Sequence, residues 1–144
     1  MANKKAIIDA DMSIESKVIG LITCIGQEYK SEMARRLAPM NLSMTQLNIL
    51  HALSFAPDHC LTVNQIKQAM IDDSPNVSRA LNKLMDAGLI EKQRSTQDQR
   101  IVHIHLTAEG AQAHVDADKQ LLDMNVEGLT KDEVEQLFDL IKKI

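Results

Sequence analysis

The sequence predicts a mainly α-helical fold with one small β-hairpin in its second half, and three observations support this. Apolar residues recur at three- and four-residue spacing along most of the chain, which is the period of an amphipathic helix. Segments 89–94 and 101–106 flank a polar stretch and alternate like strands. Serine or threonine precedes several helical segments, where a hydroxyl caps the first turn.

The chain has 144 residues, 44% hydrophobic and 25% charged, a balance that suits one folded domain or one subunit of an intertwined oligomer. Only 2% of the residues are aromatic, so aliphatic residues and eight methionines must build the core. No apolar run approaches the roughly 18 residues of a membrane helix, and the N-terminus does not resemble a signal peptide. We therefore expect a cytoplasmic protein with no membrane partner, in which Cys24 and Cys60 are free thiols.

The formal net charge of −4 argues, taken alone, against nucleic-acid binding. The charge is unevenly distributed, however. Residues 76–105 hold five basic and three acidic side chains, a net of +2, whereas residues 106–144 hold nine acidic and four basic ones, a net of −5. A basic middle beside an acidic tail suggests that one end of the protein meets polyanions.

The first long helix is expected to begin at Asp11 or Ser13 and to stop at Pro39, since proline breaks a helix. This helix is long for a small domain, so its apolar stripe can face a partner chain as easily as its own core. The stripe includes Ile14, Val18, Leu21 and Ile25.

Two further helix starts follow the capping-box pattern, in which a hydroxyl and a glutamine three residues later satisfy free amide groups. One pairs Ser43 with Gln46 and the other pairs Thr62 with Gln65. The first of these helices is expected to end near residues 56–57.

Residues 75–87 predict another helix, because Ser74-Pro75 suits a capped start and Gly88 suits a left-handed stop. Its apolar side is expected to pack on the preceding helices and consists of Val77, Ala80, Leu81 and Leu84. Its other side carries short donors and long cations, which can contact base edges and phosphates in a major groove: Asn76, Ser78, Arg79, Asn82 and Lys83. An ordinary solvated helix face has the same composition.

The hairpin 89–106 follows directly, and helices capped by Thr107 and Thr130 come after it. Two short capped helices followed by a hairpin form a winged helix-turn-helix. The second strand is expected to place alternate side chains on opposite faces, with Val102, Ile104 and Leu106 on one and Ile101, His103 and His105 on the other.

Residues 74–110 resemble the core signature of the MarR family of winged-helix transcription regulators, and the order of helices on either side agrees. The match covers about a quarter of the chain. Its elements are Val77-Ser78-Arg79, Gly88-Leu89-Ile90, Asp98-Gln99-Arg100 and Leu106-Thr107-Ala108-Glu109-Gly110. Many relatives carry arginine where this chain has Lys92, which still meets phosphate but lacks the planar fork of arginine.

The resemblance implies a single MarR-type domain, 1–144, that acts as a homodimeric, ligand-responsive repressor. Its partners would be a pseudo-palindromic operator in double-stranded DNA and a small-molecule effector. Residues 42–107 would form the DNA-binding head, and 1–41 with 108–144 the helical dimerisation region. The dimer contacts would include Ile14, Val18, Leu21, Ile25, Leu137 and Ile141.

The resemblance also assigns the DNA contacts. Arg100 would enter the minor groove, where narrow geometry concentrates negative potential, and Asp98 would orient the wing. The expected recognition-helix set is Ser74, Asn76, Ser78, Arg79, Asn82 and Lys83, and the wing set is Lys92, Arg94, Asp98 and Arg100.

The sequence favours DNA binding over two other function classes, a protein–protein adaptor and an enzyme. A winged helix can serve as a protein–protein adaptor without binding an operator, but an adaptor has no need of a charged wing tip. The chain lacks a glycine-rich phosphate loop, a zinc-protease motif and a nucleophile elbow, so we expect no enzyme activity and no cofactor.

Several lone residues were also considered. His103 and His105 share a strand face, but the sequence places no cysteine or carboxylate beside them, so no metal site is expected. Cys24 is expected to be a buried apolar thiol, with a peroxide sensor as the alternative, and Cys60 to be exposed. His51 is expected to be a core histidine with a satisfied hydrogen bond, the alternative being that it lines a ligand cavity.

Overall fold

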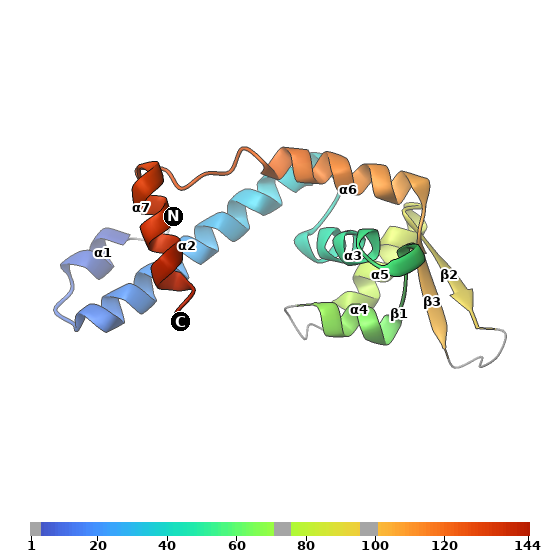
Figure 1. Ribbon diagram of the computed structural model, residues 1–144, viewed down its shortest axis with the longest axis horizontal. Coiled ribbons are helices and arrows are strands. Elements are labelled where there is room, and N and C mark those ends of the chain that lie inside the picture. Colours follow the sequence, from blue (N-terminus) through green and yellow to red (C-terminus); the bar gives the residue numbers. More distant parts are fainter. Residues whose placement is uncertain (1–3, 71–75, 96–100) are drawn as a thin grey trace.

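The computed structural model describes residues 4–70, 76–95 and 101–144. Short helices and a small sheet form a head at one end of the molecule, and longer helices extend away from it (Figure 1). The described elements are α1 (Lys4–Asp9), α2 (Ile14–Leu37), α3 (Met44–Ser54), β1 (Cys60–Thr62), α4 (Val63–Ala69), α5 (Val77–Asp86), β2 (Ile90–Arg94), β3 (Val102–Leu106), α6 (Ala108–Leu121) and α7 (Lys131–Ile141).

Helix α2 begins and ends at the residues that the sequence indicated. The Ser13 hydroxyl accepts a hydrogen bond from the Ser16 amide at 3.3 Å, which selects Ser13 rather than Asp11 as the cap. The helix ends at Leu37, and Pro39 lies in the 3-10 turn Ala38–Met40 that follows. Helix α1, which packs against α2, was not predicted because six residues are too few to show a helical period.

Both predicted capping boxes in the head are confirmed. The Ser43 amide donates to Gln46 Oε1 at 2.9 Å, and the Gln46 amide donates back to Ser43 Oγ at 3.3 Å. Thr62 and Gln65 make the same reciprocal pair at 2.8 and 3.2 Å. These boxes fix where α3 and α4 begin, and thereby how the two helices approach α5.

The two wing strands form as expected, and a third strand joins them. The sheet has the antiparallel order β1-β3-β2, with β3 in the centre. Arg94 pairs with Val102 across the hairpin, and Cys60 pairs with His105 on the other side of β3. Strand β1 was missed because three residues cannot show alternation.

The buried core lies in the head. It runs in sequence from Leu37 to Ala117 and joins α3, α4 and α5 to the sheet; its largest fully buried members are Leu37, Ile49, Leu50, Leu53, Ile66, Leu84, Ile90 and Ile104. The predicted inner side of α5 is confirmed, since Val77, Ala80, Leu81 and Leu84 are all buried. Helix α7 contributes no buried residue. In the described ranges, no helix is both long and apolar enough to cross a membrane.

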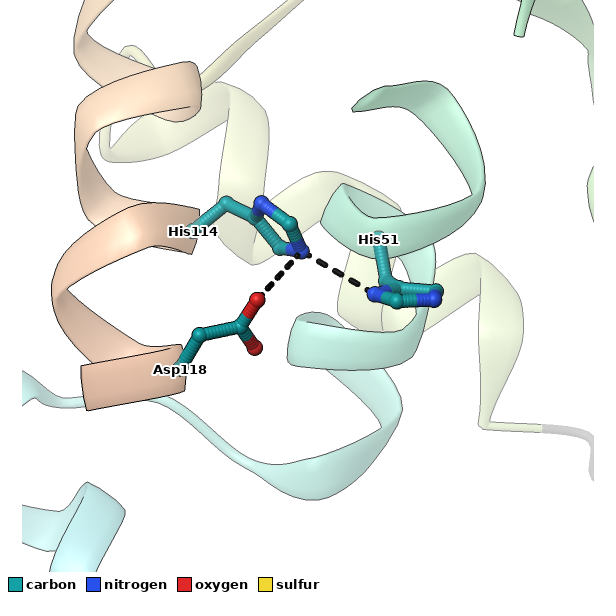
Figure 2. Close-up of side chains that lie close together, drawn as sticks. All are labelled: His51, His114 and Asp118. Atoms are coloured by element: carbon teal, nitrogen blue, oxygen red, sulfur yellow. Dashed lines mark hydrogen bonds and ion pairs between the residues drawn. The ribbon is translucent and has the colours of Figure 1, made fainter. Parts of the chain in front are cut away.

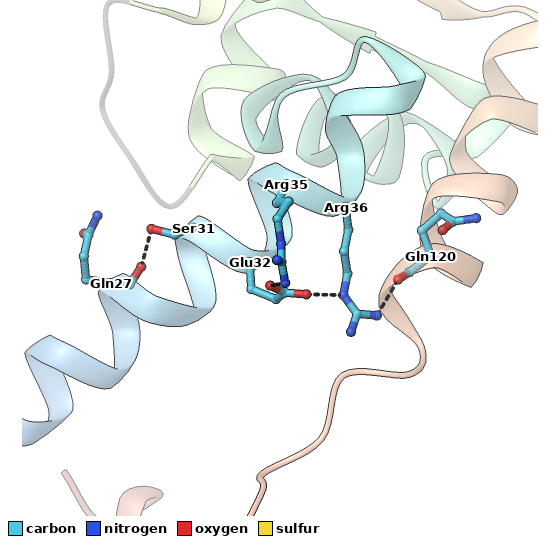
Figure 3. A network of polar contacts seen from close by, with 6 residues as sticks. All are labelled: Gln27, Ser31, Glu32, Arg35, Arg36 and Gln120. Atoms are coloured by element: carbon cyan, nitrogen blue, oxygen red, sulfur yellow. Dashed lines mark hydrogen bonds and ion pairs between the residues drawn. The ribbon is translucent and has the colours of Figure 1, made fainter. Parts of the chain in front are cut away.

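A polar network joins the C-terminal ends of α2 and α6 (Figure 3). Arg36 Nε donates to Glu32 Oε1 at 2.8 Å, and Arg36 Nη1 donates to the Gln120 carbonyl at 3.0 Å. That carbonyl belongs to the last turn of α6, where backbone oxygens lack helical partners. Hydrogen bonds from Arg36 and Arg35 hold the pKa of Glu32 below its ordinary value, so the carboxylate stays ionised and keeps Arg36 in place.

Helix α6 begins against the end of α5. A Cβ built on Gly110 would lie 2.0 Å from the Leu89 carbonyl oxygen and 2.8 Å from Leu106 Cδ1. Thr107 Oγ1 donates to the Gly88 carbonyl at 2.8 Å and accepts from the Gly110 amide at 3.0 Å. The backbone of α6 therefore touches the backbone that connects α5 to the wing, and only glycine fits at position 110.

We expect Gly110→Ala to destabilise the fold by about 1–3 kcal/mol, because the added methyl meets a backbone carbonyl that cannot rotate away. Urea unfolding followed by circular dichroism measures the change. The matched control is Gly26→Ala on α2, where a new Cβ meets nothing within 4 Å. That control should be neutral or more stable by up to about 1 kcal/mol, since alanine is the better helix former. Equal stability of the two variants would contradict the packing described for α6.

Candidate DNA-binding surface

The candidate surface consists of the outer side of α5 and the exposed edge of β2. The buried side of α5 fixes the rotation of the helix, which leaves the polar side in solvent. Every member of the recognition-helix set that the structure describes is exposed: Asn76, Ser78, Arg79, Asn82 and Lys83. Ser74 lies outside the described residues.

The end of α5 sets where the wing begins. Gly88 adopts a left-handed φ of 70°, which confirms the predicted stop. The Gly88 amide donates to the Met85 carbonyl and the Leu89 amide to the Leu84 carbonyl, both at 2.9 Å. Ile90 is then buried as the first residue of β2. The wing is thus attached to α5 through a short, hydrogen-bonded turn.

Strand β2 is an edge strand whose next four side chains, from Glu91 to Arg94, are exposed. Lys92 and Arg94 are therefore open to solvent on the hairpin, which projects from the head away from α7 (Figure 1). The Ser95 amide donates to the Ile101 carbonyl at 3.0 Å, which continues the strand pairing. Asp98 and Arg100 lie outside the described residues, so their expected roles stay predictions.

The cations of this surface form no ion pair among the described residues, as is also true of Lys5, Lys17, Lys30, Lys67, Lys131 and Lys143 elsewhere. Among the described residues, Arg79, Lys83, Lys92 and Arg94 pair with no carboxylate, and the five ion pairs of lysine or arginine lie on α1, α2, α6 and α7 or at the end of α7. An unpaired exposed cation can neutralise a phosphate without first breaking an internal ion pair.

The structure corrects three expectations about lone residues. Cys60 is half-buried, and its Sγ lies 3.7 Å from His103 Nδ1 and 3.6 Å from His105 Nε2. The sequence alone does not predict this contact, because the three residues of β1 are too few to show a strand pattern. Burial and the nearby Asp58 raise the pKa of the Cys60 thiol, which keeps it protonated at neutral pH. Cys24 is half-buried, not fully buried.

His51 is also placed differently from the prediction. Its ring is exposed rather than in the core, but its expected hydrogen bond exists, since Nδ1 lies 3.1 Å from His114 Nε2. His114, which the sequence analysis did not single out, is the buried member of this pair.

Comparison with known proteins agrees with this architecture. The sequence profile of the transcriptional regulator SarA/Rot family matches residues 34–117. The multiple antibiotic resistance protein MarR of Salmonella typhimurium is 30% identical over 128 residues, which cover 86% of this chain and 88% of that protein. The MarR protein of Escherichia coli is 28% identical over the same shares of both chains.

The chain belongs to the MarR family of DNA-binding transcriptional regulators. Solved structures share the MarR fold with it. Wild-type apo MarR from Escherichia coli matches with a TM-score of 0.76 at 24% identity, covering 94% of this chain and 98% of that one. A MarR-like regulator from Bacillus cereus matches with a TM-score of 0.80 at 19% identity, covering 90% and 94%. A mutant of Escherichia coli MarR in complex with operator DNA matches with a TM-score of 0.73 at 24% identity, covering 92% and 98%.

Proposed function

We propose that this MarR-family protein is a repressor that binds a pseudo-palindromic operator as a homodimer. The observation that carries the proposal is the outer side of α5, where five polar side chains are exposed and neither cation pairs with a described carboxylate. The solved complex of a related protein with operator DNA supports it. A repressor needs no further activity, because a protein bound at an operator blocks the polymerase by occupancy, and no catalytic role is proposed.

On this proposal α5 lies in the major groove. Arg79 can present its planar fork to a guanine edge, and Asn82 can pair with an adenine edge. Lys83, Lys92 and Arg94 neutralise phosphates on either side. Arg100 reaches the minor groove at the wing tip and Asp98 orients it, as the resemblance implies.

The proposed dimer rests on apolar surface that the single chain leaves uncovered. Among the described residues, eighteen large apolar side chains are exposed, and fifteen of them lie in residues 8–25 or 122–144. Ile14 on α2 is 69% exposed and Phe138 on α7 is 66% exposed. Exposed apolar side chains concentrated in two segments in this way favour an interface. We therefore propose residues 1–41 and 108–144 as the dimerisation region, and 42–107 as the head.

The proposed ligand response has a candidate site between the head and α6. A cleft of about 650 Å³ lies between the 3-10 turn after α2, the end of α5 and the start of α6. Met40, Leu42, Leu89 and Ala113 supply apolar lining, Lys83 supplies a positive charge, and Asp86 adds a carboxylate that an anion must avoid. This combination suits a small amphipathic anion. Because Lys83 also belongs to the proposed DNA surface, a bound anion would compete with phosphate for it.

The alternative function is a protein–protein adaptor with the same fold. The four exposed cations gathered on α5 and β2 favour DNA. Selection from random duplex DNA separates the two functions.

We expect the purified protein to select related sequences from random duplex DNA and to bind them less tightly as salt rises. Arg79→Ala should weaken binding to a selected site by about 1–3 kcal/mol and relax preference at one base position. Fluorescence anisotropy at fixed salt measures the affinity, and Arg100→Ala tests the wing in the same assay. Lys131→Ala removes a cation far from the proposed surface and should bind like the wild type. Failure to enrich any sequence would favour the adaptor.

We expect Ile25→Asp to break the dimer, because it places a charge in the apolar stripe of α2. Sedimentation velocity should show a shift from dimer to monomer at the same chain concentration. Gln27→Asp is the matched control, since Gln27 is exposed and lies two residues, or about 200°, further round the helix. A dimer that survives Ile25→Asp would argue against this interface.

We expect benzoate, an apolar ring with one negative charge, to lower operator affinity, and Leu89→Asn in the cleft lining to reduce that effect. Anisotropy titrations with and without benzoate provide the measurement, and sodium acetate at equal ionic strength is the control for salt. Equal effects of benzoate and acetate would count against the cleft as an effector site.

A further inference from the structure

Three potential metal ligands meet between α3 and α6, outside the proposed DNA surface. His51 comes from α3, and His114 and Asp118 come from α6 (Figure 2). Their side chains point toward one another across the gap between the two helices. One ligand atom from each residue lies within 4.8 Å of the other two.

The distances within this cluster suit a single metal ion. His51 Nδ1 lies 3.1 Å from His114 Nε2, and His114 Nε2 lies 3.4 Å from Asp118 Oδ2. In a tetrahedral zinc site with bonds of about 2.0–2.1 Å, neighbouring ligand atoms are separated by about 3.3 Å. The two contacts therefore already have the spacing of ligand atoms around one ion.

Hydrogen bonds alone cannot fully satisfy the three ligand atoms in this arrangement. His114 Nε2 faces a histidine nitrogen and a carboxylate oxygen at once, and one ring nitrogen carries either one proton or one lone pair. If it carries a proton, that proton is shared between two acceptors. If it carries the lone pair, it faces the carboxylate without a proton between them. A cation placed among the three atoms satisfies all of them.

The local structure holds the ligands ready and leaves a route in. His114 and Asp118 are four residues apart on α6 and so share one face of the helix. The His114 side chain is 7% exposed and is held in the interface of α3 and α6, whereas the Asp118 side chain is 48% exposed. The centroid of the Phe55 ring lies 4.7 Å from that of His51 and 6.3 Å from that of His114. An ion can enter from the solvent side and meet a fixed imidazole.

We propose that His51, His114 and Asp118 form a binding site for a divalent transition-metal ion, with zinc as the reference ion. Two imidazoles and one carboxylate suit zinc, cobalt, nickel or ferrous iron, and water completes the coordination. Magnesium and calcium prefer sites made of oxygen, so they should not compete. The sequence alone does not reveal this site, because His51 stands 63 positions before His114 and nothing in the chain links the two.

The test is calorimetric titration of tag-free protein with zinc chloride. A Cys60→Ser background removes the thiol beside His103 and His105, so that this second group does not contribute. We expect one zinc ion per chain and a rise in Tm of about 5–10 °C when free zinc is about a hundredfold above Kd. Cobalt should give the visible absorption of a low-symmetry site with nitrogen and oxygen ligands.

Each ligand variant has a control variant with the same kind of substitution at a residue outside the cluster. His51→Gln and Asp118→Asn should each weaken zinc binding at least tenfold, since even the loss of an outer-shell partner costs about 10–100-fold. Asp116→Asn on α6 and His59→Gln near α3 are matched controls outside the cluster and should bind like the parent. Two results with zinc would overturn the site. One is no zinc binding when protein and zinc are mixed at equal micromolar concentrations. The other is an equal loss of zinc affinity in the ligand and control variants. Magnesium binding as tight as zinc would do the same.

A metal ion here would tie the head to α6, and we expect it to change operator affinity at least fivefold, the lower end of usual allosteric coupling. This consequence rests on the proposed DNA binding. Anisotropy with and without zinc measures it, and His51→Gln should abolish the change. Zinc binding without any change in operator affinity would overturn this consequence alone, whereas a protein that binds no DNA under either condition would overturn the proposed function instead.

Discussion

The contact between the start of α6 and the turn after α5 fixes most of the head. The Leu89 carbonyl lies where a Cβ on residue 110 would stand, and Thr107 bonds to the Gly88 carbonyl from the same turn. That turn is also the root of the wing. One close approach of two backbones thus sets the direction of α5, the hairpin and α6 together. A change at this point would alter the proposed DNA surface and the path to the dimerisation region at the same time.

The head and the outer helices differ in whether the single chain buries their apolar residues. In the head, α3, α5 and the sheet bury their apolar faces against one another. In α2 and α7 the apolar stripes stay exposed in the single chain, although both helices have good caps. Caps and propensity stabilise a helix only marginally, and packing of an amphipathic face supplies most of its stability. The proposed partner chain would therefore supply packing to α2 and α7 that the head does not need.

The parts of the fold that could be predicted are those set by residues close together in the sequence, such as helix caps. The caps at Ser43, Thr62 and Thr130 involve residues three positions apart, so the sequence shows both partners. The inner face of α5 follows from the helical period alone. In contrast, Cys60 meets His103 and His105 only because β1 pairs with β3, and three residues give no strand pattern.

In the candidate sites too, features set by local sequence patterns could be predicted, and contacts between distant segments could not. The exposed side of α5 could be predicted because it is the complement of a periodic apolar face. The pairing of His51 with His114 could not, since it depends on how α3 and α6 cross. His51 is exposed rather than in the core as predicted, because a histidine near the end of an apolar helix can turn toward a neighbouring helix at the surface. Asp98 and Arg100 remain assigned by resemblance alone.

Helix α6 is the part of the proposed dimerisation region that is attached directly to the head. Arg36 holds its C-terminal end, Gly110 holds its N-terminal end, and His114 contacts α3 between them. Its 14 residues span about 21 Å, so a rotation of about 5° about one end moves the other by about 2 Å. Two half-sites in B-DNA are separated by about 34–36 Å. A displacement of about 2 Å in each head is enough to misalign α5 with the groove. On the proposed function, a ligand that shifted α6 relative to α3 would alter DNA binding without touching the DNA surface.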